Sequence, residues 1–222
     1  MKREIITTAD GSKTIHIPEW DEQYHSKHGA IQEAYHVFIE MGLFYFLKNK
    51  QPKFFKILEI GFGTGLNAFI TLIEAEKFNP EIDYTGVEAY PIAVGEIEKL
   101  NYTTELNASE ELFKKLHSCI WEVSSKISES FTLTKRKQFF SEIEDKNAYH
   151  LIYFDAFGAR VQPELWTEEI FQKMHDALKT GGVLVTYSAK GSVRRAMQAV
   201  GFTVERLPGP PGKREMLRAT KY

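Results

Sequence analysis

Residues 54–67 read Phe-Phe-Lys-Ile-Leu-Glu-Ile-Gly-Phe-Gly-Thr-Gly-Leu-Asn, a mostly apolar run that leads directly into a glycine-rich turn. The apolar part, residues 54–60, is too short for a helix and is typical of a strand buried on both faces of a parallel sheet. Glycines in the turn let the backbone bend sharply and approach a ligand, and free N–H groups at the start of the next helix face that ligand. The stretch predicts a strand, a ligand-binding loop and a helix in succession.

The same alternation continues toward the end of the chain. We expect helices over 65–77, 91–100, 164–178 and 191–200, and strands near 83–88, 131–134, 149–155, 182–187, 202–207 and 214–220. Strands that alternate with helices indicate a doubly wound α/β sheet. From residue 201 the pattern becomes strand, turn, strand, so the sheet is expected to end in an antiparallel hairpin. The signal is weakest over 102–130, where we predict a helix around 106–115.

The first fifty residues follow a different pattern. Residues 5–17 place an Asp-Gly turn between β-branched stretches, which is typical of a hairpin. Residues 30–48 carry apolar side chains at helical spacing. We therefore predict an N-terminal hairpin and helix extension over residues 1–50, packed on a main domain of residues 51–222.

The composition describes an ordinary globular domain. The chain has 222 residues, of which 43% are hydrophobic and 26% are charged, and a chain of this size buries roughly 70% of its unfolded surface without a disulfide staple. The single Cys119, the absence of an apolar leader and the lack of any run near ~20 apolar residues favour a cytoplasmic protein outside membranes. The histidines lack metal-ligand spacing, so no metal site is expected.

Charge is unevenly distributed along the sequence. Residues 1–188 hold 20 Lys and Arg against 28 Asp and Glu, a balance of −8, whereas residues 189–222 hold 8 against 2, a balance of +6. The net charge of −2 argues against a protein that coats nucleic acid with its whole surface. The basic tail fits either a solvated face or a phosphate-binding surface, and composition does not decide between them.

Two acids flank the glycine loop in the predicted order of elements. Glu59 stands two residues before the loop and Glu88 ends the next strand, where a carboxylate can accept both hydrogen bonds of a ribose diol. The spacing G-x-G-x-G is tighter than the dinucleotide G-x-G-x-x-G and resembles motif I of class I S-adenosylmethionine-dependent methyltransferases. An acid beside the loop suits a methionine ammonium better than a pyrophosphate, so S-adenosylmethionine is preferred to NAD as cofactor.

Asp155 closes the strand over 149–155 and should lie at the carboxyl edge of the sheet, where ligands of open α/β sheets bind. An alkyl amine acceptor arrives protonated, since its pKa is near 10, and must lose a proton before it can accept a methyl group. Asp155 can orient such an amine and take the proton. The alternative is that Asp155 merely caps the loop before the helix at Pro163.

Several motifs together resemble one known family, the bacterial tRNA (5-methylaminomethyl-2-thiouridine) methyltransferases of MnmC type. The matching stretches are Glu-Ala-Tyr-His-Val-Phe at 33–38, residues 59–67, Phe-Asp-Ala-Phe at 154–157, Gln-Pro-Glu-Leu-Trp-Thr at 162–167, and residues 181–195 with Gly-Lys-Arg-Glu-Met-Leu at 212–217. The resemblance implies a class I methyltransferase fold, Rossmann-like, with a mostly parallel seven-stranded sheet. It also implies methylation of the 5-aminomethyl group on the wobble uridine of tRNA.

The resemblance assigns roles residue by residue. It maps the active-site aspartate to Asp155 and the cofactor site to Glu59, Gly61, Phe62, Gly63, Thr64, Gly65, Asn67, Glu88 and Asp155. The family commonly has Gly-Asp after its third strand as an adenine contact, and this chain has no acid there, which leaves adenine recognition open between Gln138 and backbone. Residues 135–137 are either a second phosphate contact or an exposed loop.

The basic tail gains a use under this resemblance. Phosphates of the anticodon loop are expected to meet Lys190, Arg194, Arg195, Lys213 and Arg214, while Tyr187 or Phe157 stacks the wobble base. Tyr24 and His25 are expected to cover the site. Larger family members carry a flavin-dependent oxidase domain. Because the sequence stops at Tyr222, we expect only the methyltransferase form, with a possible oxidase partner on another chain.

Two other functions remain open from the sequence. One is a small-molecule amine methyltransferase or an aminopropyltransferase, because the hairpin and the strand with Asp155 are similar to those of spermidine synthases. A cationic polyamine would want an acidic pocket where this chain has its basic tail. The other is a module that binds the cofactor or RNA without turnover, against which the intact loop, Glu88 and Asp155 argue.

Overall fold

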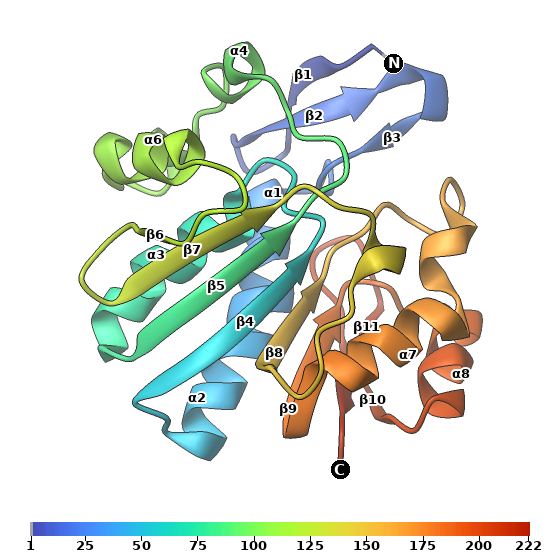
Figure 1. The fold of residues 1–222 in the computed structure, drawn as a ribbon. Helices are drawn as coiled ribbons and strands as arrows, with labels where there is room; N and C mark the ends of the chain where they lie inside the picture. Colours follow the sequence, from blue (N-terminus) through green and yellow to red (C-terminus); the bar gives the residue numbers. More distant parts are fainter. Residues whose placement is uncertain (1) are drawn as a thin grey trace.

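The computed structural model describes residues 2–222 and contains a large sheet with helices on both faces and a small N-terminal sheet (Figure 1). The strand order of the large sheet is β10-β11-β9-β8-β4-β5-β7-β6. Its strands are β4 (Phe54–Ile60), β5 (Glu81–Val87), β6 (Ser125–Lys126), β7 (Phe131–Arg136), β8 (Tyr149–Phe154), β9 (Leu178–Thr186), β10 (Thr203–Pro208) and β11 (Glu215–Thr220). The five strands from β9 to β7 are mutually parallel, and β11 and β10 form the antiparallel end.

The predicted α/β architecture with its C-terminal hairpin is confirmed, and the number of strands differs by one. The sequence pattern predicts seven strands, and the described residues form eight because β6 adds a two-residue edge strand antiparallel to β7. So short a strand leaves no periodic signal in the sequence. The addition extends the edge far from β8 and does not alter the centre of the sheet.

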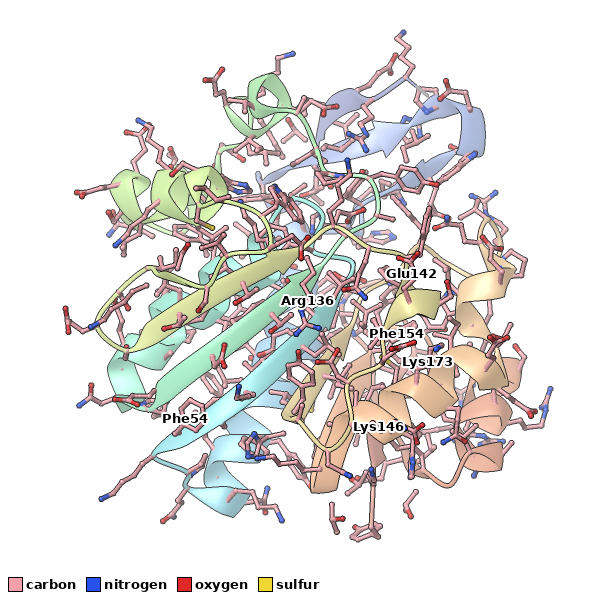
Figure 2. The ribbon with its side chains drawn as sticks, in the orientation of Figure 1. Phe54, Arg136, Glu142, Lys146, Phe154 and Lys173 are labelled. Carbon is pink, nitrogen blue, oxygen red and sulfur yellow. The ribbon has the colours of Figure 1, made fainter. Side chains whose placement is uncertain are left out.

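Strand β4 lies at the centre and separates two apolar layers. Phe55 and Ile57 face one layer and Leu58 and Ile60 the other, and all four are fully buried. Burying apolar groups on both faces is what a short continuous apolar run provides. Phe154 of β8, labelled in Figure 2, packs in the second layer against Phe171 at 5.1 Å between ring centroids.

Helices of the two layers come from different parts of the chain. One layer holds α1 (Ala30–Ala34), η2 (Tyr35–Phe44), α2 (Tyr45–Lys50) and α3 (Leu66–Phe78), and the other holds α7 (Glu168–Ala177) and α8 (Gly191–Ala199). The connection from β5 to β6 holds α4 (Val94–Ile97), α5 (Tyr102–Glu105) and α6 (Glu110–Ser118). Short 3₁₀ turns are η1 (Pro18–Trp20), η3 (Phe140–Glu142) and η4 (Pro163–Trp166). Within residues 2–222, we find no helix with the length and apolarity to cross a bilayer.

Some predicted helices have different bounds in the structure. The helix expected over 91–100 is a single turn, Val94–Ile97, because Pro91 and Gly95 disfavour a longer one. The helix expected around 106–115 lies at Glu110–Ser118, where the Ser109 hydroxyl accepts a hydrogen bond from the Leu112 N–H. These shifts move surface elements and leave the strand ends in place.

The N-terminal region forms a three-stranded antiparallel sheet of β1 (Glu4–Thr7), β2 (Lys13–Ile17) and β3 (Glu22–Gln23). It contains the predicted hairpin, and β3 is an addition. A continuous helix over residues 30–50 follows, and its middle part, η2, has the wider π-helical form. Val37, Phe38 and Leu43 of this helix are buried in the layer shared with β4. The domain boundary predicted between residues 50 and 51 stays a prediction, because this helix shares its apolar layer with β4.

Candidate active site

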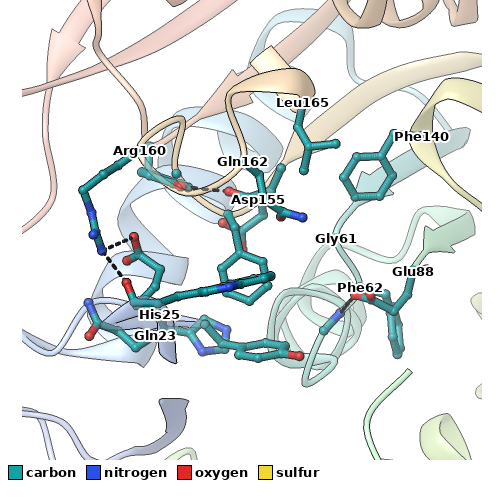
Figure 3. A pocket seen from close by; sticks show the side chains of 18 of the residues that line it. Gln23, His25, Gly61, Phe62, Glu88, Phe140, Asp155, Arg160, Gln162 and Leu165 are labelled. Carbon is teal, nitrogen blue, oxygen red and sulfur yellow. Dashed lines mark hydrogen bonds and ion pairs between the residues drawn. The ribbon is translucent and has the colours of Figure 1, made fainter. Parts of the chain in front are cut away.

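The carboxyl ends of β4, β5 and β8 point toward the N-terminal sheet (Figure 1). A cavity of about 980 Å³ is lined by residues that follow these strand ends and by residues within 20–28 of the N-terminal region. Its size is within the range of small-molecule sites. Figure 3 shows Asp155 in the middle of this site, with Phe62 and Glu88 on one side and His25 and Arg160 on the other. The topology brings together segments that are far apart in the sequence.

The glycine loop is fixed against the neighbouring strand ends. The N–H groups of Gly61 and Phe62 both donate to the carbonyl of Val87 at 3.0 Å. Gly61 has a φ of +89°, and a Cβ there would stand 2.5 Å from the carbonyl oxygen of Asp155. Phe62 is buried, and a Cβ at Gly86 would stand 2.3 Å from its ring. Gly86 is not among the predicted site residues, although a glycine inside a strand indicates such a close approach.

Glu88 and Thr64 hold the edge of the loop. The carboxylate of Glu88 accepts hydrogen bonds from the N–H of Gly63 at 3.0 Å and from the N–H of Tyr90 at 2.9 Å. Each carboxylate oxygen keeps a further lone pair, so Glu88 can still accept hydroxyl groups from a ligand in the cavity. The Thr64 hydroxyl is buried and lies 3.0 Å from the Tyr102 hydroxyl. This hydrogen bond ties the loop to α5.

Asp155 lies at the wall of the cavity and is bound by Asn67. The amide Nδ2 of Asn67 donates to Oδ2 of Asp155 at 2.8 Å and to Oε1 of Glu59 at 3.0 Å. Burial raises the pKa of Asp155 to about 7, and the nearby charge of Glu33 raises it as well. At neutral pH the group therefore exchanges a proton readily, as a general base requires.

Glu59 differs from its predicted position. Its side chain is fully buried and does not line the cavity, which places it behind Asn67 rather than in contact with a ligand. Glu59 is thus not placed for a direct contact with a ligand in this cavity, and its assignment to the cofactor site stays a prediction. Gly61, Phe62, Gly63, Thr64, Asn67 and Glu88 do line the cavity. Gly65 lies below it as the residue before α3.

An ion pair from two remote segments closes the wall beside Asp155. The ammonium of Lys213, in the turn between β10 and β11, pairs with Glu33 of α1. It also lies 3.8 Å from the centre of the Tyr187 ring, while the Tyr187 hydroxyl donates to the carbonyl of Ala156 at 2.8 Å. Glu33 is not among the predicted site residues, because only the fold brings α1 to this wall.

The N-terminal sheet covers the cavity, as predicted from Tyr24 and His25. Both line the site, and the Tyr24 ring meets the edge of Phe157 at 4.9 Å between centroids. Burial lowers the pKa of His25 to about 4, so its ring is neutral at pH 7. Arg160 fastens the cover by donating to the carbonyls of Trp20 at 3.0 Å and Asp21 at 2.8 Å.

The five predicted RNA-binding cations do not form one group. Lys190 and Lys213 line the cavity, Arg195 and Arg214 are exposed, and the Nε atom of Arg194 is buried with no hydrogen-bond partner among residues 2–222. The remaining cations of residues 189–222 form ion pairs or hydrogen bonds with other residues of the chain. Arg206 pairs with Glu215, Arg218 with Glu205, and the Lys221 ammonium donates to the carbonyls of His175 and Leu178.

Residues 135–138, at the end of β7 and directly after it, also differ from expectation. Lys135 is buried, donates to the carbonyl of His117 at 2.6 Å and lies 5.0 Å from the Trp121 ring centre, so it is neither a phosphate contact nor an exposed loop residue. Arg136 pairs with Asp145 at 2.7 Å, and Lys137 is exposed. Gln138 does not line the cavity, whereas Phe139, Phe140 and Ser141 do.

The residues present suit an adenosine cofactor with a methionine part. The sharply bent loop leaves no room for a Cβ at Gly61. The N-terminus of α3 follows the loop directly, and the Glu88 carboxylate lies at the end of β5, where it can bind a ribose. Aromatic side chains of Tyr90, Phe139 and Phe140 line the adjoining wall and can pack on a flat base. Among residues 2–222, we find no cluster of three or more metal-ligating side chains.

Comparisons with known families and proteins also point to an S-adenosyl-L-methionine-dependent methyltransferase. The profile of the family described as "S-adenosyl-L-methionine-dependent methyltransferase" matches residues 113–222. Among curated proteins, the chain is 29% identical over 231 residues to the tRNA 5-methylaminomethyl-2-thiouridine biosynthesis bifunctional protein MnmC of Cupriavidus metallidurans, covering 96% of this chain and 33% of that protein. The MnmC of Leptospira borgpetersenii is 30% identical over 211 residues, covering 89% and 32%. The chain thus spans about a third of the length of these relatives.

Solved structures show the same likeness. The crystal structure of MnmC2 from Aquifex aeolicus aligns with 100% of this chain and 70% of its own, at a TM-score of 0.82 and 26% identity. Spermidine synthase from Thermotoga maritima aligns with 100% of this chain and 72% of its own, at a TM-score of 0.56 and 15% identity. The second likeness concerns the fold alone.

Proposed function

We propose that this chain is an S-adenosyl-L-methionine-dependent methyltransferase of MnmC type, and that it methylates the 5-aminomethyl group of (2-thio)uridine at the tRNA wobble position. The product would be 5-methylaminomethyl-2-thiouridine. The observation that carries the proposal is Asp155, a half-buried carboxyl group with a raised pKa that adjoins the glycine loop in a cavity large enough for cofactor and acceptor. The names of the relatives supply the substrate class.

The cofactor is S-adenosyl-L-methionine, which supplies a methyl group on a positively charged sulfur. We assign its binding to the loop residues Gly61–Gly65, to Asn67 and to Glu88, whose carboxylate would accept the ribose hydroxyls. Phe139, Phe140 and Ser141 take the place of the missing acid in holding the base. These residues position the reacting groups, which is the main task in an in-line methyl transfer.

Asp155 would bind the acceptor amine and remove its proton. An alkyl ammonium has a pKa near 10, so most of it is protonated at pH 7 and has no free lone pair. Asp155 accepts the proton as the amine approaches, and its raised pKa makes that transfer less uphill. The covering Tyr24 and Phe157 exclude water from the same place.

The tRNA would approach past the C-terminal turn and α8. Arg195 and Arg214 are exposed and suited to phosphates, and Lys190 lies at the cavity wall. Lys213 is already paired with Glu33 beside Asp155, so we place it in the acceptor subsite instead. A wobble base that has left its stack would rest on Tyr187 or Phe157.

The decisive test uses purified protein with radiolabelled S-adenosyl-L-methionine. Three acceptors are compared: tRNA whose wobble uridine is modified only as far as 5-aminomethyl-2-thiouridine, tRNA whose wobble uridine already carries the methyl group, and putrescine. Nucleoside mass spectrometry should find the label in 5-methylaminomethyl-2-thiouridine from the first acceptor alone. Label in putrescine would support a small-molecule amine enzyme, and absence of transfer to every acceptor would overturn the proposal.

Two further proposals follow from the relatives' names. Those proteins are called bifunctional, so we propose that an oxidase acts beside this chain and releases the primary amine from a carboxymethylated precursor. We also propose that the protein works in the cytoplasm, where tRNA is modified. Affinity purification from cells at native expression should recover tRNA, and recovery of an oxidase would identify the partner.

A further inference from the structure

The carboxamide of Asn67 lies between the fully buried carboxyl group of Glu59 and the half-buried carboxyl group of Asp155. Its Nδ2 atom has two hydrogens, and the structure directs one to Oε1 of Glu59 at 3.0 Å and the other to Oδ2 of Asp155 at 2.8 Å. Asn67 is 2% exposed and Glu59 is 0% exposed. Both hydrogens of the amide are therefore used, and neither can serve a third group.

Two acceptor atoms remain without a partner at this point. Oε2 of Glu59 and Oδ1 of Asn67 are both buried and make no hydrogen bond with any described residue. They belong to side chains that already contact each other through their other polar atoms. A buried acceptor left unpaired costs about 1–3 kcal/mol, and more if it is charged. An ionised Glu59 would destabilise this arrangement in two ways, because it would bury a charge and leave both acceptor atoms unpaired.

The groups that face Glu59 offer no compensating cation. Asp155 and Glu88 face it as acids from the ends of β8 and β5, and Tyr84 approaches it from within β5 without a hydrogen bond of acceptable geometry. Tyr153 of β8 is a further neutral neighbour. Burial raises the pKa of Glu59 well above its usual value. Burial and the two acids favour the neutral form of Glu59, whereas the Tyr84 hydroxyl favours the ionised form.

We infer that Glu59 is a permanently protonated carboxylic acid that pairs with the Asn67 carboxamide through two opposed hydrogen bonds, and that Asn67 is thereby the positioning residue for Asp155. In this arrangement Oε2–H of Glu59 donates to Oδ1 of Asn67, while Nδ2–H of Asn67 donates to Oε1 of Glu59. One proton gives both unpaired atoms a partner. The second part of the inference rests on the proposed function, because it concerns the base of that reaction.

The pairing has a consequence for Asp155. With its oxygen side and one hydrogen held by Glu59, the amide of Asn67 cannot turn over, so its second hydrogen stays on Oδ2 of Asp155. That bond favours the ionised form of Asp155, as does the charge of Lys213 from the β10–β11 turn, whereas burial and Glu33 of α1 oppose it. Oδ1 of Asp155 accepts no hydrogen bond from residues 2–222, which leaves it for the acceptor's proton.

Infrared difference spectroscopy tests the protonation state directly. Spectra of the parent, of Glu59→Gln and of the Asp155→Asn control would be recorded at one pH between about 8 and 9, where Asp155 is ionised, and the spectrum of each variant would be subtracted from that of the parent. We expect a protonated-carboxyl band in the parent and in Asp155→Asn, and its absence in Glu59→Gln. No such band in the parent would overturn the inference. The measurement needs no tRNA, so its failure is separate from failure of the proposed function.

Cofactor binding and the pH profile test the positioning role. Glutamine copies a neutral acid, so Glu59→Gln should bind S-adenosyl-L-methionine within about threefold of the parent in calorimetry and leave the acid limb of kcat/KM in place. Asn67→Leu removes the donor to Asp155 and should move that limb toward higher pH by about one pH unit. A loss of affinity beyond about tenfold in Glu59→Gln would show an ionised ligand to the cofactor. An unshifted limb in folded Asn67→Leu would remove the positioning role.

Discussion

The two sides of the cavity use their polar residues differently. On the strand-edge side, residues 61–67, Glu88 and Asp155 come from the ends of three adjacent parallel strands, and nearly all of them meet at the cavity. On the C-terminal side, the basic residues of 189–222 are dispersed. Some line the cavity, some are exposed, and Arg206, Arg218 and Lys221 bind acids or carbonyls within the fold.

This contrast separates two kinds of constraint. A strand end is placed by the backbone, so the position of a residue such as Asp155 follows from the topology alone. A long cationic side chain reaches several partners, and burial or a nearby acid decides among them. On the strand-edge side, the change of a single atom should therefore alter activity or cofactor affinity strongly. On the C-terminal side, the loss of tRNA affinity should scale with the number of charges removed.

The largest effect is expected for Asp155→Asn, which removes the base and keeps the shape. The turnover number should fall by about 10²–10⁴, since proton transfer by a positioned group contributes that much. In the parent, kcat/KM should rise with pH through about 7, because the carboxylate is the active form. Quenched-flow methyl transfer measures both. A loss below about tenfold with unchanged cofactor binding would mean that Asp155 only caps its loop.

A single methyl group on the loop should be the next most damaging change. In Gly61→Ala the new Cβ would meet the Asp155 carbonyl at 2.5 Å at a φ of +89°, which costs about 1–3 kcal/mol. We expect calorimetry to show about a 10- to 100-fold loss of S-adenosyl-L-methionine affinity. Gly95→Ala in α4 is the matched control, since a Cβ there meets nothing within 4 Å. Equal affinity in the two variants would refute the close fit of the loop.

The Lys213–Glu33 pair should tune Asp155 in two directions. The Lys213 charge lowers the pKa of Asp155 and the Glu33 charge raises it. Lys213→Met should therefore move the acid limb of kcat/KM to higher pH, and Glu33→Gln should move it to lower pH, each by about half a pH unit. The limb is measured with tRNA at saturating cofactor. Movement of both limbs in one direction would contradict the acceptor-subsite position of Lys213.

The smallest effect is expected for an exposed cation. Arg195→Ala should weaken tRNA binding a few-fold and reduce the slope of log affinity against log salt by about one, the value for one lost phosphate contact. Filter binding across a salt series gives the slope. Lys221→Ala is the control, because its ammonium is bound to carbonyls of the fold. If both variants bind tRNA like the parent, the docking face lies elsewhere.

The sequence was sufficient for the parts of the site that backbone order determines. The strand at 54–60, the loop after it, the acid at the end of β5 and Asp155 at the end of β8 all lie where the alternating pattern predicts. Each depends on local composition together with the rule that ligands bind at the carboxyl edge of a parallel sheet. None depends on the conformation of a particular side chain.

The missed features depend on contacts between distant segments. Glu33 reaches the cavity only because the helix over residues 30–50 packs beside the sheet, and Gly86 is required only because Phe62 lies on it. Lys135 follows the inward face of β7, where its apolar stem is buried and its ammonium finds the His117 carbonyl. Glu59 likewise has an inward position that no charge count reveals. Such positions become visible only after the packing is known.

The position of β11 has a consequence for the order of folding during synthesis. The strand lies between β10 and β9, inside the sheet, although it is made after every other strand. A chain leaves the ribosome N-terminus first, so the loop over 61–65 emerges long before residues 215–220. Until those residues follow, the free edge of β9 stays open to pairing with other chains. Translational pausing before residue 215 should therefore lower the soluble yield of this protein more than a pause between β4 and β5.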